Sequence, residues 1–232
     1  MNRKEVTAEF MRDYQKIEST TLLRLQSEYD RERKKRKINP CSDYVKVYTI
    51  KTKAKNNWII ILRKPYSISK YKNTGDICYC CITYYYDKDG LLALRHRTEE
   101  KGIEVYWGHF FTRYNQRMHL NLGSVVEIIK TFFINSGSIA YHIHANKNFR
   151  SAGICREGFL FGKMDRENNW IINKTFVSKE IAFDSQNKAG QKIVAQFGAQ
   201  LILQLLEEDG DERETLHKTD MLLSFMDKKL TA

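Results

Sequence analysis

The chain has 232 residues, of which 42% are hydrophobic and 12% aromatic, a length and composition that can bury a full core and that exclude a disordered protein. No apolar run reaches the ~18 residues needed to span a bilayer, and the amino-terminal stretch MNRKEVTAEF lacks an apolar signal-peptide core, so we expect a cytoplasmic protein without a membrane partner. The 39 Lys and Arg against 28 Asp and Glu give a formal net charge of +11, which favours a phosphate-bearing or otherwise acidic partner.

The first predicted element is a single helix over 7–37. Apolar residues recur at near-helical spacing without an interrupting glycine or proline, and Asn39-Pro40 ends the helix. Its last turns form a run of cations with one acid among them, namely Arg31, Arg33, Lys34, Lys35, Arg36 and Lys37. This run has two interpretations: a solvated helix end that complements the helix dipole, or a patch that contacts the phosphates of a nucleic acid.

Between Asp43 and Trp107 the hydrophobic pattern changes to period two, which indicates strands. Strands are expected at 44–50, 58–62, 77–86, 91–97 and 103–107. The sequence Asp-Lys-Asp-Gly at 87–90 is typical of a hairpin turn, so an antiparallel meander is predicted. Three consecutive tyrosines at 84–86 cannot all face inward, so the sheet should present an aromatic outer surface.

Two helices and a second group of strands are expected after the meander. The helices are predicted at 109–120 and 124–135, the second with Ser124 as its N-cap. Strands follow at 139–145, in a hairpin over 153–163, and at 170–177. Helical segments are predicted from Ser178, over 191–207 and over 219–230. The acidic run at 207–214 is either a solvated loop or a segment that folds back over a basic face.

Together these elements predict an α+β fold, in which a mostly antiparallel meander sheet is packed by helices and both termini are helical. We expect three parts: a basic amino-terminal helix at 1–40, an α+β core domain at 41–180, and a carboxyl-terminal helical segment at 181–232 that packs on the core.

Cysteine spacing and nucleotide motifs exclude several classes of site. The five cysteines, Cys41, Cys78, Cys80, Cys81 and Cys155, form neither a disulfide framework nor paired zinc knuckles, so reduced and mostly buried thiols are expected. The chain contains no GxxxxGK[ST], GxGxxG, GxSxG or HExxH sequence, which disfavours NTPases, dinucleotide enzymes, α/β-hydrolases and zinc proteases. We therefore expect neither a cofactor nor a metal.

The stretch from Trp107 to Arg117 is the richest in chemistry. On a helix, His109, Arg113 and Arg117 fall within about 80° of one another, while Phe110, Tyr114 and Met118 form a neighbouring stripe that should bury against the sheet. Such a face suits phosphoryl transfer, because a histidine can move protons and arginines can bind phosphate. The alternatives are phosphate binding without chemistry and a plain solvated helix face.

Metal-free RNA cleavage needs a second acid or base. His142 and His144 are candidates, because residues two apart on a strand share one face, and Lys174 and Thr175 can add a cation and a hydroxyl. The two histidines can equally be ordinary strand residues.

The sequence His109-Phe-Phe-Thr-Arg113-Tyr-Asn-Gln-Arg117 resembles the H-x-x-x-R-[YM]-x-x-R helix of small proteins from bacterial mobile elements. It also resembles, more loosely, the nuclease toxins of the RelE- and ParE-like group. The resemblance covers about a tenth of the chain and rests on this one motif. It implies a ribonuclease activity, with His109, Arg113 and Arg117 as the residues that carry it.

These observations predict a nucleic-acid-directed protein, with RNA favoured over DNA as its partner. Its sharpest form is a metal-independent ribonuclease of toxin type, with His109 as acid or base and the arginines as phosphate clamps. One alternative is a non-catalytic module that binds through the 31–37 run and exposed tyrosines. Another is a phage or mobile-element interaction protein, whose terminal helices dock a partner such as an antitoxin or a second copy.

Overall fold

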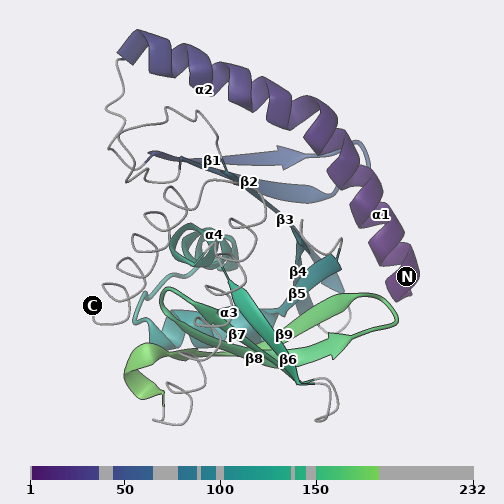
Figure 1. Cartoon of the computed structure of the whole chain (residues 1–232), viewed down its shortest axis with the longest axis vertical. Coiled ribbons are helices and arrows are strands. Elements are labelled where there is room, and N and C mark those ends of the chain that lie inside the picture. Colours follow the sequence, from purple (N-terminus) through teal and green to yellow (C-terminus); the bar gives the residue numbers. More distant parts are fainter. Residues whose placement is uncertain are drawn as a thin grey trace, which may run out of the picture.

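The computed structural model describes residues 2–36, 44–64, 78–87, 90–97, 102–136, 139–144 and 150–182. The described part contains one nine-stranded sheet with the order β1-β2-β3-β4-β5-β9-β8-β7-β6 (Figure 1). Its strands are β1 Tyr44–Lys51, β2 Asn57–Lys64, β3 Cys78–Asp87, β4 Gly90–Arg97, β5 Gly102–Trp107, β6 Ala140–His144, β7 Arg150–Cys155, β8 Gly158–Asp165 and β9 Trp170–Ser178. The helical elements are α1 Arg3–Lys16, the π-helical turn η1 Ile17–Leu22, α2 Leu23–Arg36, α3 Gly108–Arg117, α4 Val125–Asn135 and the 3-10 turn η2 Lys179–Ile181. The predicted α+β fold is confirmed.

Two antiparallel meanders make up the sheet. The first is β1 to β5, and the second is β6 to β9. They are joined because β5 and β9 pair in parallel, with Ile103 opposite Trp170 and Tyr106 opposite Asn173. A parallel pair needs a long crossover connection, and α3 and α4 lie within the one between these two strands.

The long amino-terminal helix begins earlier than the sequence pattern predicted, because a capping box fixes its start. The Asn2 side chain accepts a hydrogen bond from the Glu5 backbone N–H at 3.0 Å, and the Glu5 carboxylate accepts one from the Asn2 N–H at 2.8 Å. In the middle, η1 interrupts the α-helical hydrogen-bond pattern. There the Thr20 hydroxyl donates to the Lys16 carbonyl at 2.5 Å, a contact that competes with the regular ladder.

The first meander has helices on both of its faces. Its outer face, defined here as the face beneath α1 and α2, has a core centred on Trp58, whose ring lies 5.2 Å from that of Phe10. The inner face packs against α3 and α4 around the fully buried Phe132. In Figure 1, α3 and α4 lie between β1 to β3 on one side and β6 to β8 on the other, so the sheet curls around them.

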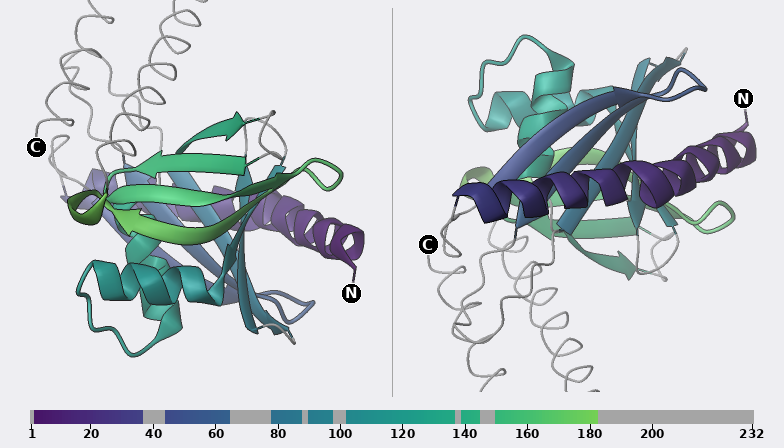
Figure 2. Two further views of the ribbon diagram at one scale, coloured as in Figure 1. Left: turned by 90° about the horizontal axis from the view of Figure 1, so that it is seen from below. Right: turned by 90° about the horizontal axis from the view of Figure 1, so that it is seen from above.

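The outer face of the second meander differs from that of the first. The left panel of Figure 2 shows the broad face of β7, β8 and β9, and no helix of the described part crosses it. The core beneath α1 and α2 includes Trp170 and Ile172 of β9, but it contains none of the described residues of β6, β7 or β8. An outer sheet surface is therefore left without a helical cover in the described part of the chain.

Other predicted features have mixed outcomes. Ser124 stands at the N-cap of α4, but its side chain makes no capping hydrogen bond. The helical segment expected from Ser178 begins as the three-residue turn η2. The helices expected at 191–207 and 219–230 and the acidic run at 207–214 lie outside the described residues. None of the helices in the described ranges combines the length and apolar character needed to cross a membrane.

His96 on β4 is stacked against Tyr14 of α1, with 4.3 Å between the ring centroids. Both of its ring nitrogens are buried and have no hydrogen-bond partner among the described residues. Burial lowers the pKa of His96 below its ordinary value of 6.5, although the carboxylate of Glu18 opposes the shift. The folded state therefore holds the neutral ring, and the unfolded state binds more protons as the pH falls through 6.5.

We expect the free energy of unfolding to decrease as the pH drops below about 6.5, and His96 to add no pH dependence above that value. The variant His96→Phe keeps a ring against Tyr14 but cannot titrate, so it should flatten this part of the stability profile. Chemical denaturation at several pH values between about 5 and 7 measures both slopes. Equal slopes for the parent and the variant would contradict the assignment.

Candidate nucleic-acid interface

Helix α3 starts where β5 ends, and its buried side chains fix its orientation. Phe110 and Tyr114 are fully buried in the inner core, and Met118 packs against that core while partly exposed, as predicted. The Tyr114 hydroxyl donates to the Glu157 carboxylate at 2.7 Å, which ties the helix to the turn between β7 and β8. The opposite side of α3 is thereby held toward solvent.

Of the three predicted helix residues, two are exposed and one is not. His109 and Arg113 are exposed, and Arg117 in the last turn is partly buried. The Arg117 Nη1 atom is buried without a hydrogen-bond partner among the described residues. Arg113 Nη1 donates to the Thr175 hydroxyl on β9 at 2.7 Å, so the structure brings these two predicted residues together.

Lys174 is next to this contact, at an irregularity of β9. Phe161 pairs with Thr175 and Gly162 pairs with Asn173, which leaves Lys174 as the extra residue of a β-bulge. Its side chain is exposed. The cations of Arg113 and Lys174 therefore flank Thr175 at one end of the outer face of β6 to β9, which lacks a helical cover in the described part.

His142 lies on the same face of the sheet as Thr175. The register places His142 opposite Ala152, Ala152 opposite Phe161, and Phe161 opposite Thr175, and directly opposed residues point to the same side. We call this set the outer row. At roughly 4.8 Å per strand, His142 and Thr175 are about 14 Å apart, so His142 is not a partner for proton transfer at Arg113. His144 is at the end of β6, and its side chain lies outside the described part.

Two further cations share this face and were missed at the level of sequence. Arg150 pairs with Lys163, Lys163 pairs with Ile172 of the outer core, and both charged side chains are exposed. Phe161 of the outer row is half-buried and stacks with Phe159 at 6.5 Å between centroids. The alternation of Phe159, Phe161 and Lys163 along β8 was the available signal.

Asp165, an acidic residue at the border of this surface, is already hydrogen-bonded within the protein. Asp165 at the end of β8 accepts a hydrogen bond from Arg3 at 2.6 Å and another from the Asn168 amide at 2.9 Å. Burial opposes the charge on Asp165, but hydrogen bonds from Asn168 and Arg3, together with the Arg3 charge, outweigh it and lower the pKa of Asp165. The surface formed by Arg113, Arg150, Lys163, Lys174 and the outer row, which we call the cationic outer face, is positively charged in its described part.

The basic end of α2 forms a separate cationic region. Arg31, Lys34 and Lys35 are exposed, and Glu32 pairs with Lys46 of β1 at 2.9 Å. Figure 1 places this end of α2 on the opposite side of the molecule from β6 to β8. The backbone of Arg33 and Arg36 is helical, but their side chains and the whole of Lys37 lie outside the described residues.

A buried polar network on the inner face was also not anticipated. Arg95 on β4 faces Glu104 on β5 at 3.6 Å, and the Tyr106 hydroxyl donates to the Glu104 carboxylate. The Tyr141 hydroxyl lies 3.3 Å from that of Tyr106 and accepts a hydrogen bond from the Asn173 amide at 3.0 Å. These contacts connect four strands, β4, β5, β6 and β9, across the curled sheet.

Of the cysteines in the described part, Cys81 and Cys155 are buried, Cys80 is partly buried and Cys78 is exposed. Cys78, Cys80, Cys81 and Cys155 are free, and Cys41 lies outside the described residues. Burial raises the pKa of Cys80, Cys81 and Cys155, which keeps them protonated. No group of three or more His, Cys, Asp or Glu side chains within the described ranges is arranged to hold a metal ion.

No family model, curated protein or solved structure matches the chain. The resemblance of the segment from His109 to Arg117 to the RelE- and ParE-like toxins therefore stays a prediction from the sequence.

Proposed function

We propose that the protein binds single-stranded nucleic acid, with RNA as the first candidate, on the cationic outer face. The observation that carries this proposal is the combination found on the outer face of β6 to β9, which no helix of the described part covers. Arg113, Arg150, Lys163 and Lys174 surround an outer row that contains a half-buried Phe161 and His142. Cations that follow a backbone and aromatic rings that stack on bases are the two elements of single-strand recognition.

Charge and geometry support each part of the proposal. Lys and Arg that contact phosphates release counterions, which gives salt-sensitive affinity without base preference. The bulge directs Lys174 into solvent, and the Thr175 hydroxyl orients the Arg113 guanidinium beside it. Phe161 lies between His142 and Thr175 in the outer row. A nucleic-acid strand bound along this row would therefore pass over the Phe161 ring, with the polar side chains of His142 and Thr175 on either side.

The arrangement favours binding over cleavage. A metal-free ribonuclease needs two proton-transfer groups on opposite sides of one phosphate. Two strands, β7 and β8, lie between His142 on β6 and the strand β9 against which α3 and His109 are held. We therefore expect RNA incubated with the pure protein to stay intact, with and without a chelator, as judged by gel electrophoresis. His109-dependent cleavage would instead support the toxin-type ribonuclease.

The variant Lys163→Gln/Lys174→Gln tests the proposed surface. Each phosphate contact with a single strand contributes about 0.7 to the slope of log affinity against log salt, so removing two should lower the slope by about 1.4. Titration of a labelled oligoribonucleotide, and of its DNA counterpart, at several salt concentrations measures this slope.

The matched control is Lys51→Gln/Lys53→Gln, which removes two exposed lysines near the turn between β1 and β2. It carries the same change in net charge at a distant place, and it should keep the parental slope. The proposal fails if the parent does not bind at low salt, or if both double variants change the slope equally.

A further inference from the structure

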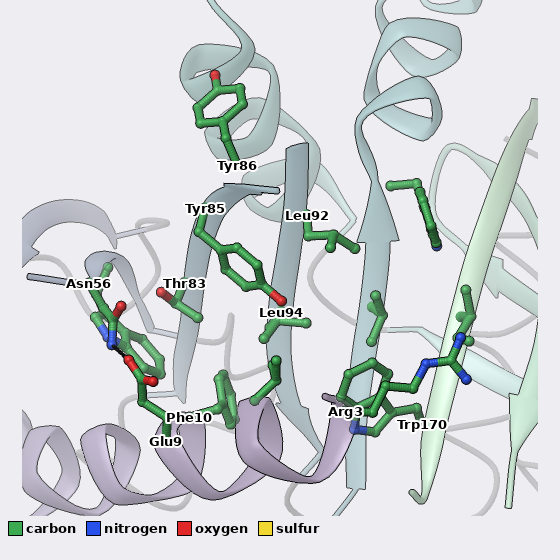
Figure 3. Close-up of a pocket in the computed structure, with 15 residues that line it drawn as sticks. Arg3, Glu9, Phe10, Asn56, Thr83, Tyr85, Tyr86, Leu92, Leu94 and Trp170 are labelled. Carbon is green, nitrogen blue, oxygen red and sulfur yellow. Dashed lines mark hydrogen bonds between the residues drawn. The ribbon is translucent and has the colours of Figure 1, made fainter. Parts of the chain in front are cut away.

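A cavity of about 450 Å³ lies between α1 and the outer face of β2 to β5 and β9. Its volume falls within the range of small-molecule pockets, roughly 300–1,000 Å³. Six of its lining residues are aromatic, namely Phe10, Trp58, Tyr85, Tyr86, Trp107 and Trp170. Figure 3 shows Phe10 and Arg3 extending from α1 toward the strands, and Tyr85 lying over the strands from β3. Phe10, Trp58 and Trp170 are buried behind the wall, whereas the partly exposed Tyr85 and Trp107 can contact a flat ligand.

Most polar groups of the lining are already paired within the protein. The Asn56 amide donates to Glu9 at 2.9 Å, the Thr83 hydroxyl donates to the Asn57 carbonyl at 2.8 Å, and Trp170 Nε1 donates to Thr7 at 3.0 Å. Two lining atoms remain, Nε1 of Trp58 and Nε1 of Trp107, which are buried without a hydrogen-bond partner among the described residues. Trp58 is fully buried, so its N–H lies behind the cavity wall, and the cavity itself presents mainly aromatic and apolar surface.

The cavity adjoins the cationic outer face. Ile172 lines the cavity and is the cross-strand partner of Lys163. Trp107 lines it as well, and its ring lies 6.3 Å from that of the exposed His109 at the start of α3. At the border, Tyr86 is 68% exposed and points away from the cavity. A strand bound along Lys163 and Lys174 thus runs beside the cavity.

We propose that this cavity receives one unstacked nucleobase of the bound single strand. A base fits the chemistry of the walls, because it has two ring faces for stacking against partly exposed aromatic side chains such as Tyr85 and Trp107. The net charge of the chain and the adjacent cations supply the attraction for the phosphates on either side. This inference rests on the proposed function, since the strand on the outer face delivers the base.

The test uses the full chain and a labelled oligoribonucleotide of roughly 12 nucleotides, a length within the usual footprint of single-strand binders. One abasic nucleotide is placed at each position in turn. Loss of one stacked base weakens binding about ten- to hundred-fold. We expect this weakening at one or two adjacent abasic positions of the oligonucleotide. In Trp107→Leu the cavity has lost one aromatic wall, so an abasic nucleotide at these positions should no longer weaken binding. Tyr48→Leu, which changes an aromatic residue outside the lining, is the matched control and should keep the parental pattern.

Trp58→Phe guards against a folding defect, because it keeps a ring in the core and removes only the unpaired N–H and part of the indole. This variant should still unfold in one cooperative transition, at a lower denaturant midpoint because the smaller ring leaves space in the core, and it should show a reduced sensitivity at the same position. If the parent binds the oligonucleotide but every abasic position behaves alike, the cavity is not a base site and the proposed function still holds. If the parent does not bind at low salt, both proposals are wrong.

Discussion

Replacing Glu104 by glutamine (Glu104→Gln) is expected to lower the free energy of unfolding by about 3–5 kcal/mol, the range found when one partner of a buried ion pair is removed. Glu104 is 3% exposed, and the side chain of Arg95 is 18% exposed. The variant keeps the volume of the side chain but leaves the Arg95 guanidinium without a compensating charge. Denaturant unfolding at neutral pH measures the change.

The direction of each hydrogen bond in the network explains why removing the charge of Glu104 costs more stability than removing that of a surface acid. Burial opposes the charge on Arg95, but the carboxylate of Glu104, together with smaller contributions from Cys80, Tyr106 and Tyr141, outweighs it, so the pKa of Arg95 is raised. Burial, and then the same carboxylate, raise the pKa of Tyr106 and Tyr141, so both phenols stay protonated. Tyr106 gives its one hydroxyl hydrogen to Glu104, so Tyr141 must donate to Tyr106. Glu104 is thus the final acceptor of the whole chain of donors.

Two controls separate charge from packing. In Arg95→Met/Glu104→Gln the unpaired cation is gone, so the double variant should recover part of the stability lost in Glu104→Gln. Glu127→Gln breaks an ion pair between two partly exposed side chains, with Lys130 at 2.8 Å, and should change stability by less than about 0.5 kcal/mol. A Glu104→Gln variant as stable as the Glu127→Gln variant would contradict the role assigned to the network.

The strands were predictable from local pattern, and their assembly was not. Period-two patterning and a β-rich composition placed the five strands of the first meander close to their observed bounds, even though strands such as β2 and β5 are buried on both faces. The parallel pairing of β5 with β9 leaves no local trace, since it joins residues such as Ile103 and Trp170 that are far apart in the chain. The start of α1 was missed because Asn2 and Glu5 form their capping box outside the apolar stripe.

The candidate site was predictable only in pieces. Helical spacing identified the exposed His109 and Arg113 and the buried Phe110 and Tyr114. Helical spacing does not show which strand residues lie next to α3. The contact of Arg113 with Thr175 and the distance from Thr175 to His142 therefore could be found only from the packing and register of the sheet. The cavity likewise depends on the packing of α1 over strands that follow it in sequence.

Replacing Gly162 by alanine (Gly162→Ala) is expected to lower the free energy of unfolding by about 3 kcal/mol, at the upper end of the usual effect of overpacking. A Cβ atom at this position would lie 1.9 Å from the Ile172 carbonyl oxygen. The obstacle is backbone and not a flexible side chain, so β8 and β9 must move apart for the methyl group to fit. Gly123→Ala, at a glycine whose Cβ would meet nothing within 4 Å, is the matched control and should stay within about 0.5 kcal/mol of the parent.

Gly162 also connects stability with the proposed surface, because the close approach of β9 at this residue accompanies the bulge. Gly162 pairs with Asn173 and Phe161 with Thr175, so a displaced β9 changes where Lys174 points and moves Thr175 away from Arg113. At a temperature where the variant is still folded by circular dichroism, Gly162→Ala should therefore bind single-stranded RNA more weakly than Gly123→Ala does, with a shallower salt dependence. A folded Gly162→Ala variant with parental affinity and slope would show that the bulge does not position the cations for binding, and the interface would then have to lie elsewhere on the molecule.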